Sequence, residues 1–172
     1  QNEEMVRSFE SMKFAIALAV FLVYLVMASQ FESLLHPFVI MFTIPLGVVG
    51  SAFALFIKGE NISVVVLIGL IMLSGIVVNN AIVLIDYVNQ LRRNQSLSKI
   101  EAVIRAGQLR FRPIMMTTTT TVLGLLPMAM GLGEGSEIRS PMAVTVIGGL
   151  IVSTALTLVI IPVVYTIFDR GE

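Results

Sequence analysis

The chain has 172 residues, of which 56% are hydrophobic and 13% are charged, and its mean hydropathy is +0.95. Soluble domains carry about 25% charged residues, so this composition predicts an integral membrane protein. The zero net charge argues against nucleic-acid binding, and the lack of cysteine excludes disulfide bonds and thiolate metal sites.

The first third of the chain contains a short polar lead and two predicted membrane spans. Residues 3–11 are predicted to form a short polar helical lead, and a first membrane span covers about 13–28. No basic segment or initiator methionine precedes that span, so we expect the chain to be cut from a longer protein. The second span covers about 37–57, and its Pro45 with the nearby Gly47 predicts a kink.

The third span, about 64–90, carries polar residues inside an apolar helix. At 100° per residue, Gly75, Asn79, Ile82 and Asp86 lie on one stripe of that helix. Polar groups in a membrane helix avoid lipid, so this stripe predicts a buried polar seam against a neighbouring helix.

Residues 91–112 carry six Arg or Lys against a single acid. Such a basic connection is typical of the cytoplasmic side of a membrane. Within it, apolar residues at helical spacing predict an amphipathic interfacial helix over about 98–109. Ser98 and Glu101 have the spacing of a capping box at its start.

A fourth span is predicted over about 113–131 and a fifth over about 142–168, joined by a glycine-rich external turn. Arg110 and Thr117 share one stripe of the fourth helix. Arg110 either reaches the cytoplasmic interface or contacts a carboxylate inside the bundle, and the sequence leaves both open. The predicted fold class is thus an all-α membrane protein with five transmembrane helices and one cytoplasmic interfacial helix.

The chain resembles the resistance-nodulation-division (RND) exporters of the hydrophobe and amphiphile type. The motifs that carry the resemblance are Phe31-Glu-Ser-Leu-Leu-His-Pro-Phe38, Ile44-Pro-Leu-Gly47, Gly75-Ile-Val-Val-Asn-Asn-Ala-Ile-Val-Leu-Ile-Asp86, Arg110-Phe-Arg-Pro-Ile-Met-Met-Thr117, Leu125-Leu-Pro127, Gly148-Gly149 and Ile161-Pro-Val-Val-Tyr165. They extend over essentially the whole chain. The resemblance implies the last five helices of a pump, which form half of a twelve-helix bundle and follow an external substrate-handling region.

The resemblance implies proton-driven export of drugs or other amphiphiles. In the family the proton-binding aspartates belong to the first half of the pump, and this half supplies their polar partners. The positions that match those partners are Asn79, Asn80, Arg110 and Thr117. Many drug exporters carry lysine where Asn79 stands, and an amide does not neutralise a carboxylate as an ammonium does.

The expected partners follow from the same resemblance. They are the lipid bilayer, the first half of the same pump, and, in a Gram-negative cell, a homotrimer working with a periplasmic adaptor and an outer-membrane channel. The expected location is the bacterial inner (plasma) membrane, as a multi-pass protein. We expect neither an enzyme nor a cofactor or metal site.

Structural interpretations compete with these roles. Asn79 and Asn80 have an alternative role as interhelical hydrogen-bonding residues, and Asp86 has one as a solvated interface residue with at most a minor part in transport. Thr118 to Thr121 are expected to bond to their own helix carbonyls. The competing function class is a membrane bundle that serves packing or assembly only, and export of metal ions or lipids is an alternative within the transporter class.

Overall fold

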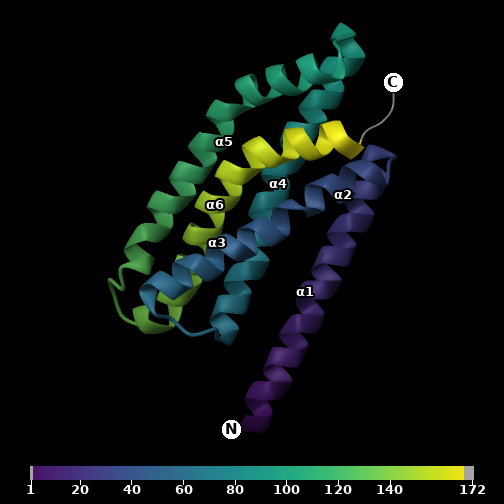
Figure 1. Cartoon of the computed structure of the whole chain (residues 1–172). Helices are drawn as coiled ribbons and strands as arrows, with labels where there is room; N and C mark the ends of the chain where they lie inside the picture. Colours follow the sequence, from purple (N-terminus) through teal and green to yellow (C-terminus); the bar gives the residue numbers. More distant parts are fainter. Residues whose placement is uncertain (1, 169–172) are drawn as a thin grey trace.

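The computed structural model describes residues 2–168, and this part of the chain forms six helices. Their bounds are α1 Asn2–Phe31, α2 Leu35–Met41, α3 Thr43–Lys58, α4 Val64–Gln95, α5 Lys99–Ala129 and α6 Ser136–Phe168. Figure 1 shows α3 to α6 as a bundle, with α1 beside it and closest to it near α2. The start of α1 and the end of α6 lie at opposite ends of the molecule in Figure 1, as expected for an odd number of spans.

Within residues 2–168, four helical segments are long and apolar enough to cross a membrane: Glu3–Phe31, Leu35–Lys58, Val64–Gln95 and Ser136–Phe168. These segments contain the predicted first, second, third and fifth spans. Helix α5 is not among them, because its inner part carries arginines and five consecutive threonines lower its hydropathy. The crossing of the fourth span therefore stays a prediction.

The second span carries a one-residue interruption at Phe42, three residues before the Pro45 at which a kink was predicted. Helix α2 ends at Met41 and α3 begins at Thr43, two residues before Pro45. Pro45 has no N–H to bond the carbonyl four residues earlier, which belongs to Met41, and its ring crowds that carbonyl. Thr43 Oγ1 donates instead to the Ile40 carbonyl at 2.7 Å, so the break carries a local hydrogen bond.

The predicted boundary between an interfacial helix and a fourth span is corrected by α5, which runs without interruption through Pro113. Figure 1 shows that α5 changes direction along its length. The predicted capping box is confirmed, because Glu101 N donates to Ser98 Oγ and the Glu101 carboxylate accepts from Ser98 N. The first turns of α5 are held against α4 by buried small residues, Ala102 and Ala106.

Two helices of the bundle approach closely through small residues. A Cβ added at Gly148 of α6 would lie 2.1 Å from the Ala54 Cβ of α3. Ser51 Oγ also donates to the Thr145 carbonyl across this interface, at 2.8 Å. Close approach through Gly, Ala and Ser is the usual basis of helix association in membranes.

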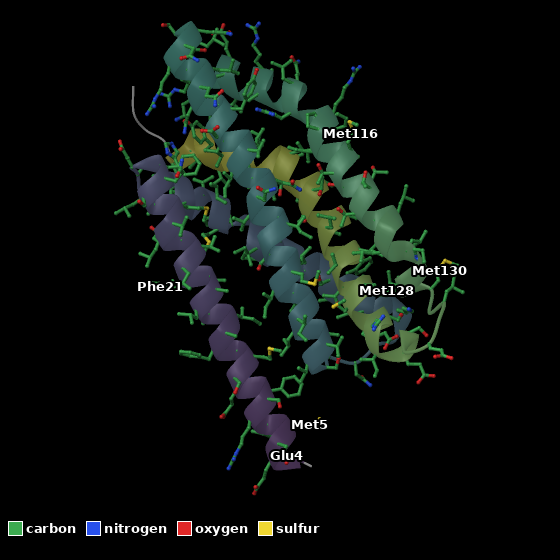
Figure 2. The ribbon with its side chains drawn as sticks, turned by 180° about the vertical axis from the view of Figure 1, so that it is seen from behind. Glu4, Met5, Phe21, Met116, Met128 and Met130 are labelled. Atoms are coloured by element: carbon green, nitrogen blue, oxygen red, sulfur yellow. The ribbon has the colours of Figure 1, made fainter. Side chains whose placement is uncertain are left out.

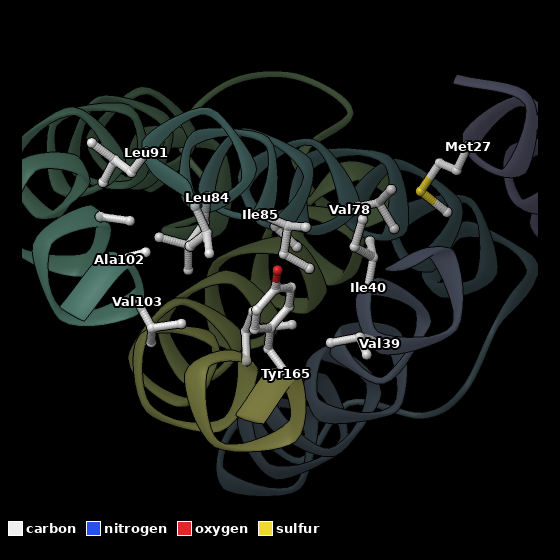
Figure 3. Packing of buried hydrophobic residues seen from close by; sticks show 14 residues of the cluster. Met27, Val39, Ile40, Val78, Leu84, Ile85, Leu91, Ala102, Val103 and Tyr165 are labelled. Atoms are coloured by element: carbon white, nitrogen blue, oxygen red, sulfur yellow. The ribbon is translucent and has the colours of Figure 1, made fainter. Parts of the chain in front are cut away.

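The main hydrophobic cluster lies where α2, α4, α5 and α6 meet. Figure 3 shows Tyr165 of α6 in the middle of this cluster, with its hydroxyl directed toward α4. Tyr165 is only 1% exposed, so it is a core residue with a polar tip.

At the opposite end of the bundle, one lysine joins three helices. Lys58, the last residue of α3, donates from Nζ to the Ala129 carbonyl of α5 at 2.6 Å. It also donates to Ser140 Oγ of α6 at 2.5 Å. We call this the outer end, and the end with Tyr165 the inner end.

Candidate functional site

The predicted stripe on α4 is real but mostly exposed within the described chain. Gly75, Asn79 and Asp86 are all exposed, and a Cβ added at Gly75 would meet no atom within 4 Å. Ile68 and Met72 extend the exposed stripe toward the outer end. The stripe is therefore only partly covered by the described helices, because Gly75 borders a pocket that α1 also lines and Asp86 lines a cavity near the end of α1.

The two asparagines lie on different faces of α4. Asn80 is 8% exposed, whereas Asn79 is exposed. Asn80 shares a stripe with Tyr87, seven residues along, and Tyr87 contacts α5 through Arg110. Asn80 therefore faces the α4–α5 side, and Asn79 faces the open side.

Arg110 stacks on an aromatic ring. Its guanidinium carbon lies 4.5 Å from the centre of the Tyr87 ring, a cation–π geometry. Its Nε is buried and has no hydrogen-bond partner within the described residues. The sequence had left open a contact with the interface or with a carboxylate, and it gave no sign of the ring.

Thr117 lies two turns from Arg110, at the depth of Asn80. Asn80 lies seven residues from Tyr87 on α4, and Thr117 lies seven residues from Arg110 on α5. Both therefore lie about 10 Å from the Tyr87–Arg110 contact, toward the outer end. Thr117 is exposed, and its hydroxyl donates to the Pro113 carbonyl at 3.0 Å. It has the back-bonded geometry that was expected of its neighbours.

Thr118 was wrongly assigned to back-bonding. It is 6% exposed, and its hydroxyl lies 3.0 Å from the Thr154 hydroxyl of α6. Among Thr118 to Thr121 within the described residues, Thr121 makes the expected bond to its own helix, because its hydroxyl donates to the Thr117 carbonyl at 2.9 Å. A run of five threonines gives no sign of which one faces another helix, so the sequence did not identify this pair.

Asp86 lies nearer the inner end than Asn79. It accepts a hydrogen bond from Gln90 Nε2 at 3.0 Å and lines a polar cavity of about 670 Å³. His36 of α2 lines the same cavity and stacks on Tyr165 with ring centres 5.6 Å apart. Within residues 2–168, no three His, Asp or Glu side chains form a group suited to a metal ion.

The whole chain matches one family. Residues 1–169 match the model of the AcrB/AcrD/AcrF family. The chain belongs to this family of RND transporters. Its helical bundle is therefore that of a membrane protein from an efflux transporter family.

Solved structures agree with this assignment. The chain is similar to a heavy metal efflux pump in crystal form II, with 34% identity and a TM-score of 0.87 over 98% of the chain. Crystal form I of a heavy metal efflux pump gives 32% identity and a TM-score of 0.84 over 99% of the chain. The RND chain described here spans 16% and 17% of the length of those two pump chains.

Proposed function

We propose that this chain is the C-terminal membrane half of a proton-driven RND exporter and supplies polar partners to its proton relay. In this role Arg110 provides a fixed positive charge, Asn79 and Asn80 provide amides, and Thr117 provides a hydroxyl. The proton-binding carboxylates come from the first half of the pump. The proposal includes a membrane crossing by α5, which completes five spans.

One observation supports the role of Arg110 best. Its charged guanidinium stacks on Tyr87, and its buried Nε has no hydrogen-bond acceptor among residues 2–168. A buried donor on a charged group is costly unless a partner satisfies it. An ionised aspartate from the other half of the pump would satisfy this donor. Protonation of that aspartate would weaken the pairing and allow the helices to move.

The exposed Asn79 on α4 supports a polar partner on the open face of that helix. An exposed amide is costly against lipid, so another polar surface is expected to cover Asn79. Asn79 carries no charge, so Arg110 supplies the compensating charge in this relay, and Asn79 hydrogen-bonds the acid. Asp86, near the inner end, has a minor role.

The cellular arrangement is proposed by analogy with the family. The pump would lie in the bacterial inner membrane as a homotrimer. In a Gram-negative cell it would work with a periplasmic adaptor and an outer-membrane channel.

The proposed substrates are drugs and other amphiphiles, with metal ions as the second candidate. The similarity to a heavy metal efflux pump favours the second candidate. Among the methionines labelled in Figure 2, Met128 and Met130 lie near each other at the end of α5, whereas Met5 lies at the start of α1 and Met116 lies further along α5. They do not form one cluster of thioether ligands, so they give little support to a path for soft metal ions. Susceptibility of a pump-deficient host to dyes, detergents and metal salts would decide between the two classes.

Replacing Arg110 tests the relay. In the full-length pump, Arg110→Ala is expected to abolish most export and proton uptake at matched expression. Asp86→Asn is expected to be mild, because water solvates either form of that carboxyl at the inner end. Arg110→Lys is expected to be intermediate, since it keeps the charge and loses the planar fork. Normal export by Arg110→Ala would contradict the relay and favour a purely structural role for this bundle.

A further inference from the structure

The inner end of the bundle contains a polar cavity that none of the relay residues explains. Its volume is about 670 Å³. It is lined from the end of α1, from α2, from the inner end of α4 and from the link after α4. The lining residues are Gln30, Phe31, Glu32, His36, Asp86, Asn89, Arg92, Arg93, Ser96 and Leu97.

The lining favours water. Eight of these ten residues are polar or charged, and they include two carboxylates and two guanidiniums. A large cavity with many polar partners holds water, whereas an apolar one stays dry. By contrast, a groove of about 300 Å³ between α5 and α6 is lined mainly by residues such as Met115, Val122 and Ile151. That groove suits lipid chains.

The cavity lies at the depth where the proposed relay ends. Asp86 is on its wall, and the next residue, Tyr87, carries the stacked Arg110 guanidinium. Asp86 is also seven residues from Asn79, about 10 Å along α4. The basic link that follows α4 places this end of the molecule on the cytoplasmic side.

One buried side chain holds the cavity wall. The Tyr165 hydroxyl donates to Asn89 Oδ1 at 2.9 Å and accepts from Arg92 Nη1 at 3.1 Å. Its ring lies parallel to the His36 ring, with an angle of 10° between the planes. Tyr165 of α6 therefore contacts three lining residues, two on α4 and one on α2.

We propose that this cavity is a hydrated vestibule through which protons leave the relay for the cytoplasm, with Tyr165 as the positioning residue of its wall. The inference rests on the proposed proton coupling. Among residues 2–168, the titratable and charged groups that face the vestibule are Glu32 from the α1–α2 link, His36 from α2, Asp86, Arg92 and Arg93 from α4, and Tyr165 from α6.

Cysteine labelling tests the water-filled path. The full-length pump, with cysteines outside this chain replaced, receives Asn89→Cys on α4 or Leu97→Cys in the link after α4, both in the lining of the cavity. A membrane-impermeant cationic methanethiosulfonate is applied to the cytoplasmic face of inside-out vesicles. We expect both cysteines to react and proton uptake during export to be largely lost. Asn94→Cys lies at the exposed end of α4 and outside the cavity. It is expected to react with the reagent without loss of proton uptake.

Two tyrosine-to-phenylalanine variants test whether Tyr165 positions the cavity wall. Tyr165→Phe keeps the ring and removes two hydrogen bonds, so proton uptake is expected to fall roughly three- to tenfold, with a changed pH profile and normal expression. Tyr24→Phe is the matched control, because its hydroxyl donates to the Leu34 carbonyl at 3.3 Å and does not line the cavity. We expect no change in that variant.

The possible failures are distinguishable. A parent pump that exports without proton uptake would overturn the proposed function itself. A parent that takes up protons, with uptake unaffected by modification at both cavity cysteines, would overturn the vestibule alone. Unchanged uptake and pH profile in Tyr165→Phe would show that Tyr165 is an ordinary core residue.

Discussion

The close contact between α3 and α6 gives the most quantitative prediction. In Gly148→Ala the new Cβ would lie 2.1 Å from the Ala54 Cβ and 3.0 Å from the Gly50 carbonyl oxygen. Carbon atoms pack at about 3.5–4.0 Å, so the helices must separate locally by about 1.5 Å. Ala54 has no rotatable side chain to relieve the clash, so the backbones must move.

The expected cost has two parts. Overpacking of this kind costs about 1–3 kcal/mol. Separation also stretches the 2.8 Å hydrogen bond from Ser51 to the Thr145 carbonyl, and such bonds in membranes contribute about 0.6–1.7 kcal/mol. Together the substitution is expected to destabilise the bundle by about 2–4 kcal/mol.

Thermal stability of the purified full-length pump in detergent measures this effect. The readout is the fraction of monodisperse protein after heating, determined by size-exclusion chromatography. Gly124→Ala in α5 is the matched control, because its Cβ would meet no atom within 4 Å. An unchanged midpoint in Gly148→Ala, equal to that of Gly124→Ala, would refute the tight packing of α3 on α6.

Three further predictions concern topology and polar contacts. Cysteines at Ser96 and Ser136 are expected to be labelled from opposite sides of the membrane, and labelling from the same side would contradict the topology. Lys58→Met is expected to lower thermal stability, since it removes two hydrogen bonds at the outer end, each contributing about 0.5–1.5 kcal/mol. Thr118→Val and Thr154→Val are each expected to destabilise the pump in the same heating assay, and the double variant by less than their sum, because each single change leaves a buried hydroxyl without its partner. Strict additivity would show that the two hydroxyls do not interact.

The helices were predictable because membrane helices obey local rules. Long apolar runs indicated the spans that four segments now contain, and the periodicity of α4 put Asn79 and Asp86 on one stripe. The Ser98 capping box follows from a four-residue motif. Each of these features depends on residues close together in the sequence.

Contacts between helices were less predictable. Stripes show which residues share a face of one helix, and they do not give the register between two helices. The Arg110–Tyr87 stack, the Thr118–Thr154 pair and the contacts of Tyr165 join residues 23 to 129 positions apart. Their geometry depends on how closely α3, α4, α5 and α6 approach, and small residues such as Gly148 set that distance.

The distribution of polar groups on α4 distinguishes its packing from its proposed transport role. Asn80 and Asn89 are buried or half-buried within the described chain, and Tyr165 bonds the second of them. Asn79 and Asp86 are exposed on another face of the same helix. A helix that only held a bundle together would gain from an apolar residue at position 79, because a polar group against lipid is costly. The amide of Asn79 is better explained by a covering surface that changes its protonation, which is the role proposed for the first half of the pump. On this reasoning, Asn79→Leu should impair proton uptake with little loss of stability, whereas Asn80→Leu should lower both.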